Sequence, residues 1–256
     1  DQLAARMHKA IAIMQFKLEG QLIKEHPEFD LDKRLLLDKI DFENGTVNVE
    51  GTVYPLNDTF FPTIDPNNPY ELTEDERAVM NSLSASIINS ERLQTHIRYM
   101  FSHGALYKRI NGNLLFHGCI PMDENGDFLP VDIYGAKCAG RALMDHLDKQ
   151  IRASYFSPEK IKKYGKPGDL MWYLWLAKDS PLFGKEKMTT FERLFIDDKA
   201  SHKEHVRPYY KLINSKEPCE KILREFGLDP SHSKILNGHV PVKIKNGESP
   251  IKGGGL

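Results

Sequence analysis

Apolar side chains recur at every third or fourth position along the first part of the chain, and this spacing predicts one long amphipathic helix over residues 2–26. Pro27 ends the pattern, because proline cannot continue a helix from its interior. We expect the apolar stripe to face the interior of the protein, with an oligomer interface as the alternative. Its members are Leu3, Met7, Ile11, Met14, Leu18 and Leu22.

Three Asn-Gly pairs before residue 130 mark tight turns, because both residue types tolerate the positive φ angles of two-residue hairpins. Asn44-Gly45 lies within a β-rich segment, residues 35–56, and Asn111-Gly112 lies within a predicted hairpin, residues 105–118. The third pair, Asn125-Gly126, predicts a further turn. Strands therefore occur in both halves of the chain.

Helical segments separate these turns. Thr73 and Glu76 form a capping box, and the helix that it opens is predicted to run to about Phe101, with a break near Asn89-Ser90, and to stop at Gly104. The rest of the chain predicts three more helical segments, at residues 143–151, 168–175 and 218–227. Residues 233–247 predict a strand, a sharp turn and a second strand.

Composition and charge narrow the function classes. The 256-residue chain has 35 Lys and Arg against 36 Asp and Glu, so no bulk field attracts nucleic acid or an anionic membrane. The 40% apolar content fits a folded protein, and no apolar run approaches the roughly 18 residues of a membrane span. No signal peptide is visible and the three cysteines form no CxxC pair, so we expect a cytoplasmic protein that binds neither nucleic acid nor membrane.

Two short stretches place a histidine in matching surroundings. His117 lies in "LLFHGCIP" and His239 in "ILNGHVPV", each with an apolar strand, an adjacent glycine and a nearby proline. Glycine permits a sharp turn beside the imidazole, and side chains at the ends of neighbouring strands can converge. Neutral imidazoles suit zinc, iron or manganese, so the two histidines are a candidate metal pair. A lone histidine at such a place is more commonly structural.

These two stretches resemble the fourth and fifth blocks of the calcineurin-like metallophosphoesterases, and "GDLMWYLW" is similar to the Asp-Leu-Leu-Trp segment of the phosphoprotein phosphatases. Longer blocks, among them "AIMQFKLEGQLIKEHPEF", "TIDPNNPYELTEDE" and "SPLFGKEKMTTFERLFIDDK", resemble the class III fructose-1,6-bisphosphatases of Firmicutes. The resemblance covers nearly the whole chain. It implies an α/β fold in which residues 105–256 are the C-terminal half of a metallophosphoesterase-type β-sandwich flanked by helices. Residues 1–104 would be a mainly helical insertion with a β-hairpin.

The same resemblance implies a manganese-dependent cytoplasmic hydrolase (EC 3.1.3.11). It would act on a small sugar bisphosphate, releasing the 1-phosphate of fructose 1,6-bisphosphate to give fructose 6-phosphate in gluconeogenesis. In the related fold a dinuclear centre holds the phosphoryl oxygens, and His117 and His239 match the ligands of one metal. Arg193 and Lys187 are candidate substrate contacts, because cationic side chains bind phosphate oxygens, and ordinary surface charges are the alternative.

The upstream carboxylate and histidine blocks of the family have no counterpart in the sequence. "MDHLD" at residues 144–148 lacks the residue that separates Asp from His in the first block. We therefore assign no catalytic residue and expect this chain to supply only part of a bisphosphatase site. The alternatives are a non-catalytic C-terminal fragment, which binds its own N-terminal half or forms a homo-oligomer, and a protein phosphatase of the same superfamily.

Three further features carry weaker signals. His202 and His205 form an H-x-x-H pair, but the charged residues around them favour a solvated helix over a metal site. Cys119 follows the first His-Gly pair directly, yet no base partner is visible, so we expect a buried structural thiol. Trp172 and Trp175 are expected to pack in the core.

Overall fold

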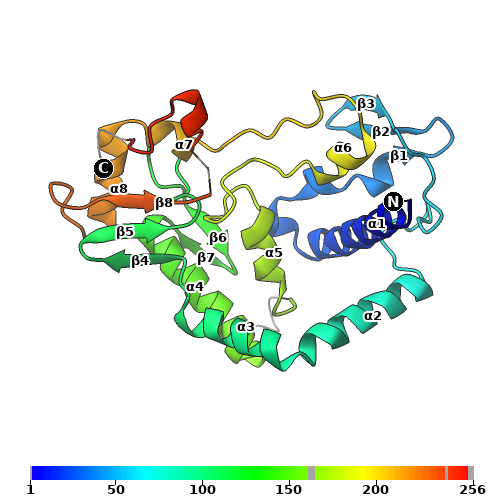
Figure 1. Cartoon of the computed structure of the whole chain (residues 1–256), viewed down its shortest axis with the longest axis horizontal. Helices are drawn as coiled ribbons and strands as arrows, with labels where there is room; N and C mark the ends of the chain where they lie inside the picture. The colour runs from blue at the N-terminus through cyan, green and yellow to red at the C-terminus, as the bar shows by residue number, and fades with distance from the viewer. Residues whose placement is uncertain (1, 161–164, 240–241, 253–256) are drawn as a thin grey trace. The chain divides into compact units, whose positions relative to one another are not determined.

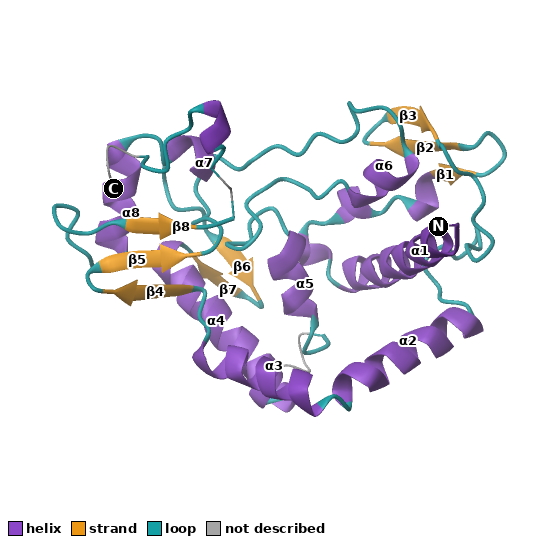
Figure 2. Cartoon of the chain, viewed as in Figure 1, coloured by secondary structure: helices purple, strands orange, loops and turns teal. Residues whose placement is uncertain are grey.

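The computed structural model describes residues 2–160, 165–239 and 242–252, and it has the predicted mixed α/β character, with small sheets and helices (Figures 1 and 2). The chain divides into two compact units. Unit 1 comprises Asp1–Tyr99 and Lys187–Glu204, and unit 2 comprises Met100–Glu186 and His205–Leu256. The division after residue 99 lies near the predicted boundary at 104, whereas residues 187–204 group with unit 1.

One long helix, α1 (Gln2–Glu25), opens unit 1 and ends before Pro27, as predicted. The expectation that its whole apolar stripe faces inward is wrong at the N-terminal end. Three members of the stripe are at least half exposed: Leu3, Met7 and Ile11. The buried residues of α1 begin in the middle of the helix and include two charged side chains, Lys17 and Glu19. A hydrophobic pattern cannot identify these two positions, because charged side chains are buried only when they are paired.

Three short strands form an antiparallel sheet in unit 1, in the order β1 (Ile40–Asp41), β2 (Thr46–Val49) and β3 (Thr52–Pro55). The predicted turn at Asn44-Gly45 joins β1 to β2, and Gly45 has a φ of 64°. Residues of β2 share a core with Phe191 and Phe195 of α6 (Thr190–Phe195), which explains why residues 187–204 belong to this unit. Single 3₁₀ turns lie between α1 and the sheet, at Pro27–Phe29, Asp32–Arg34 and Leu37–Lys39.

Two consecutive helices, α2 (Glu74–Ile88) and α3 (Glu91–His103), confirm the predicted capping box and the predicted break. The Thr73 hydroxyl accepts from the N–H of Glu76, while the Glu76 carboxylate accepts from the N–H of Thr73. After α3, the N–H of Gly104 donates to the carbonyl of Met100 at 2.8 Å, which closes the last helical turn as expected.

Unit 2 contains a three-stranded sheet in the order β4-β5-β8. Strands β4 (Tyr107–Ile110) and β5 (Asn113–Phe116) form the predicted hairpin, and both turn residues, Asn111 and Gly112, have positive φ angles. Strand β8 (Ile235–Asn237) pairs with β5 in parallel. A separate two-stranded sheet consists of β6 (Val131–Ile133) and β7 (Ala136–Cys138). Gly126 has a positive φ at the third predicted turn.

Unit 2 also contains the helices α4 (Gly140–Phe156), α5 (Asp169–Leu176), α7 (Tyr209–Leu212) and α8 (Lys216–Glu225). Single 3₁₀ turns lie at Pro158–Lys160 and Ile244–Asn246. Helix α8 begins two residues before the predicted Pro218, and Gly227 follows it with a φ of 70°. Among the residues that the structure describes, no helix is both long enough and apolar enough to span a membrane.

Two predictions for unit 2 are wrong. Trp175 is 49% exposed rather than part of the core, and it lies beside the half-buried Trp172, with ring centroids 5.1 Å apart. The second strand predicted within residues 233–247 is also absent from its described part, where Ile244–Asn246 forms a 3₁₀ turn; Val240 and Pro241 lie outside the described residues. Ile244 is exposed, so no buried surface rewards an extended conformation there.

A buried ion pair connects α1 to the start of α2 within unit 1. Lys17 is fully buried, and its Nζ lies 2.7 Å from the Glu76 carboxylate and 2.5 Å from the carbonyl oxygen of Thr63. Burial acts to raise the pKa of Glu76, but hydrogen bonds from Lys17, Thr63 and Thr73 outweigh it and lower that pKa. The capping carboxylate of α2 therefore also neutralises the buried ammonium of α1.

Replacing Lys17 with methionine should destabilise the protein by about 3 kcal/mol, because the Glu76 carboxylate would remain buried without its cation. Urea unfolding followed by circular dichroism measures the loss. Lys33→Met is the matched control, since the Lys33–Glu50 pair is exposed and should contribute about 1 kcal/mol or less. Equal effects of the two substitutions would contradict this assignment.

The lowered pKa of Glu76 also makes the stability of the protein depend on pH. Because the folded-state pKa of Glu76 is lowered from 4.5, its contribution is present above that value and is lost as the pH falls through the lower, folded-state pKa. Acidification below about pH 4.5 should therefore destabilise the wild-type chain more than Lys17→Met.

Candidate metal centre

The candidate site lies where two parallel strands end. Strands β5 and β8 pair with Phe116 opposite Asn237, so the next residues along each strand, His117 and Gly238, leave the sheet at the same edge. His239 follows one position later. The carboxyl ends of parallel strands meet at one edge of a sheet. The convergence predicted from the two histidine motifs is therefore confirmed.

The two imidazoles face each other although they are 122 residues apart in sequence. Nδ1 of His239 lies 3.3 Å from Nε2 of His117, and the ring centroids are 5.2 Å apart with an interplanar angle of 80°. His117 is exposed and His239 is half-buried, so the pair is accessible from solvent. At this separation, one nitrogen must carry a hydrogen and the other a lone pair, or both must share a cation.

The surroundings of His239 favour its neutral form. Burial lowers the pKa of His239, and electrostatic interactions with His117 and Lys185 lower it further. A hydrogen bond with the backbone of Phe183 acts in the opposite direction. A backbone group that holds one side of an imidazole also fixes the orientation of the ring, as it commonly does for metal-binding histidines. A neutral, oriented ring has a lone pair available for a metal.

The backbone on both sides of the pair is sterically constrained. His239 has a φ of 64°, a left-handed conformation that non-glycine residues adopt infrequently. Gly118 packs so closely on the neighbouring loop that a Cβ there would lie 2.2 Å from the carbonyl oxygen of Pro181. A Cβ at Gly238 would lie 3.2 Å from the carbonyl oxygen of His117. The two glycines beside the histidines therefore allow close approach of the backbone.

The spacing of the two nitrogens fits a shared metal ion. Two nitrogens bound to one tetrahedral zinc at about 2.1 Å lie about 3.4 Å apart. The observed separation is 3.3 Å. Within the described ranges, no third His, Cys, Asp or Glu brings a ligand atom within 4.8 Å of both histidines. This chain thus offers two imidazole ligands, and a complete hydrolytic centre requires carboxylates from elsewhere.

The two predicted substrate contacts lie in unit 1 and are engaged there. Lys187 is mostly buried, and its Nζ lies 2.6 Å from Glu50 and 3.2 Å from Glu192. Lys187 lowers the pKa of Glu50 to about 2 through a hydrogen bond, and Lys33 contributes to the same shift. The structure therefore provides a local reason for the burial of Lys187, and its contact with substrate stays a prediction.

Arg193 is also held by neighbours in unit 1. Its Nε donates to the Thr189 hydroxyl at 3.0 Å, and a terminal nitrogen donates to the carbonyl of His202 at 3.1 Å. The carboxylate of Glu204 lies 3.7 Å from Nε. The side chain is nevertheless 54% exposed, so part of the guanidinium faces solvent. Its predicted phosphate contact is not tested by these interactions.

The solvated helix predicted around His202 and His205 is wrong, because both residues lie in an irregular segment. The half-buried His202 ring contacts the carbonyl oxygens of Glu192 and Ile196 at 3.0 and 2.8 Å with its Nε2, which closes the end of α6. His205 belongs to unit 2, whereas His202 belongs to unit 1. A charge pattern could not reveal that these carbonyl groups stabilise a loop conformation.

Cys119 is a buried structural thiol, as expected. It is 1% exposed, its Sγ lies 3.6 Å from the carbonyl oxygen of Ser180, and its N–H donates to Pro181 at 2.7 Å. Burial raises the pKa of this thiol to about 12. The thiolate required for nucleophilic chemistry is therefore absent at neutral pH.

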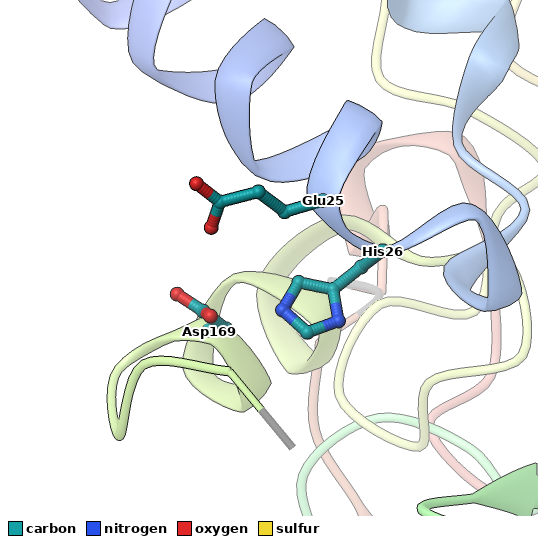
Figure 3. Close-up of side chains that lie close together, drawn as sticks. All are labelled: Glu25, His26 and Asp169. Carbon is teal, nitrogen blue, oxygen red and sulfur yellow. The ribbon is translucent and has the colours of Figure 1, made fainter. Parts of the chain in front are cut away.

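Two buried polar side chains were not identified by the sequence patterns. These two are His26 and Asp169, which Figure 3 shows together with Glu25. His26 follows α1 in unit 1, where its Nδ1 lies 2.7 Å from the Glu28 carboxylate. Asp169 begins α5 in unit 2, where its carboxylate accepts from the N–H of Lys166 at 2.6 Å. Each side chain has a partner within its own unit, which accounts for its burial.

Gly118→Ala should destabilise the protein by about 1–3 kcal/mol, because the new methyl group would collide with the backbone at Pro181 rather than with a movable side chain. Urea unfolding provides the measurement. Gly168→Ala is the matched control: a Cβ at Gly168 would have nothing within 4 Å, so this change should be neutral or slightly stabilising. An unaffected Gly118→Ala variant would contradict the close packing.

Alkylation should distinguish the cysteines. With iodoacetamide at pH 8, the half-buried Cys138 should be labelled first, whereas the buried Cys119 should react only after unfolding, because its thiol is both inaccessible and protonated. Mass spectrometry of the digested protein at timed intervals measures both rates. Comparable labelling of the two thiols in the folded chain would contradict a structural role for Cys119.

Comparison with known proteins supplies the family. The model of the Firmicute fructose-1,6-bisphosphatase family matches residues 1–256. The fructose-1,6-bisphosphatase class 3 of Clostridium acetobutylicum is 55% identical over 254 residues, and that of Clostridium tetani is 54% identical over 255 residues. Each alignment covers 99% of this chain and 38% of the relative. No solved structure matches the chain. This chain belongs to the Firmicute fructose-1,6-bisphosphatase family.

Proposed function

We propose that this chain forms part of an enzyme that hydrolyses the 1-phosphate of fructose 1,6-bisphosphate to give fructose 6-phosphate and phosphate, and that His117 and His239 supply two ligands to its metal centre. The main support is the 3.3 Å approach of two ring nitrogens in a member of this family. Relatives named for this activity match 99% of the chain. The proposal places the enzyme in the cytoplasm and in gluconeogenesis.

The proposed metal is Mn²⁺ in a dinuclear centre. A divalent ion of this kind polarises phosphoryl oxygens and lowers the pKa of bound water. The task of His117 and His239 is to hold one ion with neutral nitrogens, and the lowered pKa of His239 keeps its lone pair available near pH 7. The bridging carboxylate and the acid that assists the leaving group would come from the part of the enzyme that corresponds to the remaining length of the relatives.

Arg193 and Lys187 are proposed to contact substrate phosphate. The half-exposed guanidinium of Arg193 has the fork geometry that suits a phosphate group. Lys187 would have to exchange its contact with Glu50 or Glu192 for a phosphate oxygen. Arg193 is therefore the stronger candidate of the two. At the level of the fold, we propose that unit 2 contributes to a metallophosphoesterase-type β-sandwich and that most of unit 1 is an insertion into it.

A chimera tests this function. Replacing the matching segment of the Clostridium acetobutylicum relative with this chain should give Mn²⁺-dependent phosphate release from fructose 1,6-bisphosphate, which EDTA abolishes. His117→Ala or His239→Ala in the chimera should lower kcat/KM at least about 100-fold, because the ion would lose one of its two imidazole ligands. A coupled assay for fructose 6-phosphate measures the rate.

His232→Ala is the matched control, because this exposed histidine precedes β8 and contacts Asp229 rather than another imidazole. Its chimera should keep the wild-type rate. If His117→Ala also keeps that rate, the metal role fails. If the chimera folds but hydrolyses only phosphopeptides, the protein phosphatase alternative replaces the bisphosphatase. A folded chimera without either activity would favour a non-catalytic role for this chain.

A further inference from the structure

The side chain of Asn237 connects the ends of the two strands that carry the histidines. Its Nδ2 donates to the carbonyl oxygen of His117 at 3.1 Å and to that of Gly118 at 2.5 Å. Its Oδ1 accepts from the hydroxyl of the buried Tyr209 at 3.2 Å. Both donor hydrogens and the acceptor oxygen of the amide are thus used. The carboxamide holds the backbone of one histidine from the strand of the other.

We propose that Asn237 is a positioning residue that sets the separation of the two imidazoles. It touches neither ring and acts through the backbone of His117 and through its own place two residues before His239. Because this inference concerns ligands of the proposed metal centre, its importance for catalysis rests on the proposed function. The geometric role is independent of the metal.

The main-chain hydrogen bonds between β5 and β8 end before the two histidines, so the Asn237 side chain has a distinct part in joining the strands there. Strands β5 and β8 pair over only three residues, ending with Phe116 opposite Asn237. The next ladder contact, from the N–H of Gly238 to the carbonyl of Phe116, is long at 3.4 Å. Beyond it, His239 adopts its left-handed conformation. The main-chain ladder therefore weakens before the histidines are reached, and the Asn237 amide supplies two further hydrogen bonds between the two chain segments.

An asparagine at this position does what aspartate and serine cannot. The two acceptors are consecutive carbonyl groups, and an uncharged amide nitrogen offers one hydrogen to each. Aspartate has no donor when ionised, and serine has only one hydrogen. The Tyr209 hydroxyl fixes which end of the amide faces the carbonyls, because it donates to Oδ1. Tyr209 is thereby a second contributor to the same geometry.

A second asparagine provides a matched comparison at the opposite end of the same strand pair. The Oδ1 of Asn113 accepts from the N–H of Lys234 at 2.8 Å and joins the beginnings of β5 and β8. Asn113 and Asn237 therefore each link the two strands by one carboxamide. Only Asn237 adjoins the histidines, so a purely structural role predicts equal consequences of their loss, whereas a positioning role predicts different ones.

The test measures Zn²⁺ binding by the whole chain with isothermal titration calorimetry, using the His117→Ala/His239→Ala double variant to identify binding at the pair. Asn237→Ala should weaken this binding about tenfold, as substitutions behind metal ligands commonly do. Asn113→Ala should bind Zn²⁺ like the wild-type chain, although both substitutions lower the unfolding midpoint. Equal Zn²⁺ affinities for Asn237→Ala and the wild type would overturn the proposal, and so would equal weakening by Asn113→Ala.

Two further measurements keep the outcome decisive. If Asn237→Ala does not fold, Tyr209→Phe replaces it, since this change removes only the hydroxyl that orients the amide; it should weaken Zn²⁺ binding, and unchanged affinity would overturn the proposal. If the wild-type chain and the double histidine variant bind Zn²⁺ equally, the metal role itself fails. The ring signals of His117 and His239 in metal-free NMR spectra then decide: they should shift in Asn237→Ala and not in Asn113→Ala.

Discussion

The parallel pairing of β5 with β8 is the constraint on which the candidate site depends. It aligns Phe116 with Asn237, and it thereby brings His117 and His239 to one edge of the sheet from positions 122 residues apart. Three paired residues supply few hydrogen bonds, so side-chain amides and close-packed glycines must extend the contact beyond the ladder. The geometry of the candidate site therefore depends on the strand ends as much as on the imidazoles themselves.

The packing of unit 1 depends instead on buried ion pairs. The pair of Lys17 with Glu76 and the pair of Arg34 with Glu19 are almost completely buried. Arg34 also donates to the carbonyl of Met188 at 2.5 Å, so it holds the segment that leads into α6. Breaking such pairs leaves an uncompensated charge in the interior. Lys187 belongs to a separate set of ion pairs, in which its ammonium lies between the carboxylates of Glu50 and Glu192.

Local signals were sufficient for part of this structure. The capping box, the Asn-Gly turns and the break between α2 and α3 arise from interactions among neighbouring residues, and all were predicted from sequence. The two histidines were also found, because glycine and proline mark the ends of their strands. The hydrogen bonds from Asn237 that join the ends of their two strands depend on a parallel pairing that no local pattern encodes.

The wrong predictions have a common physical origin. Leu3 and Trp175 are apolar residues on helices, and composition alone favours burying them, yet burial requires a neighbouring surface that the sequence pattern does not specify. Around His202 and Ile244, the sequence patterns favoured regular structure that does not form. Contacts with backbone carbonyl groups hold the His202 ring in an irregular segment. Ile244 is exposed, so an extended strand there would bury no apolar side chain.

The most direct test of the shared metal site is anomalous X-ray diffraction from crystals of this chain soaked in Zn²⁺. One anomalous peak is predicted about 2.0–2.1 Å from both Nε2 of His117 and Nδ1 of His239. A zinc ion bound elsewhere, with the two rings still in direct contact at 3.3 Å, would contradict the account.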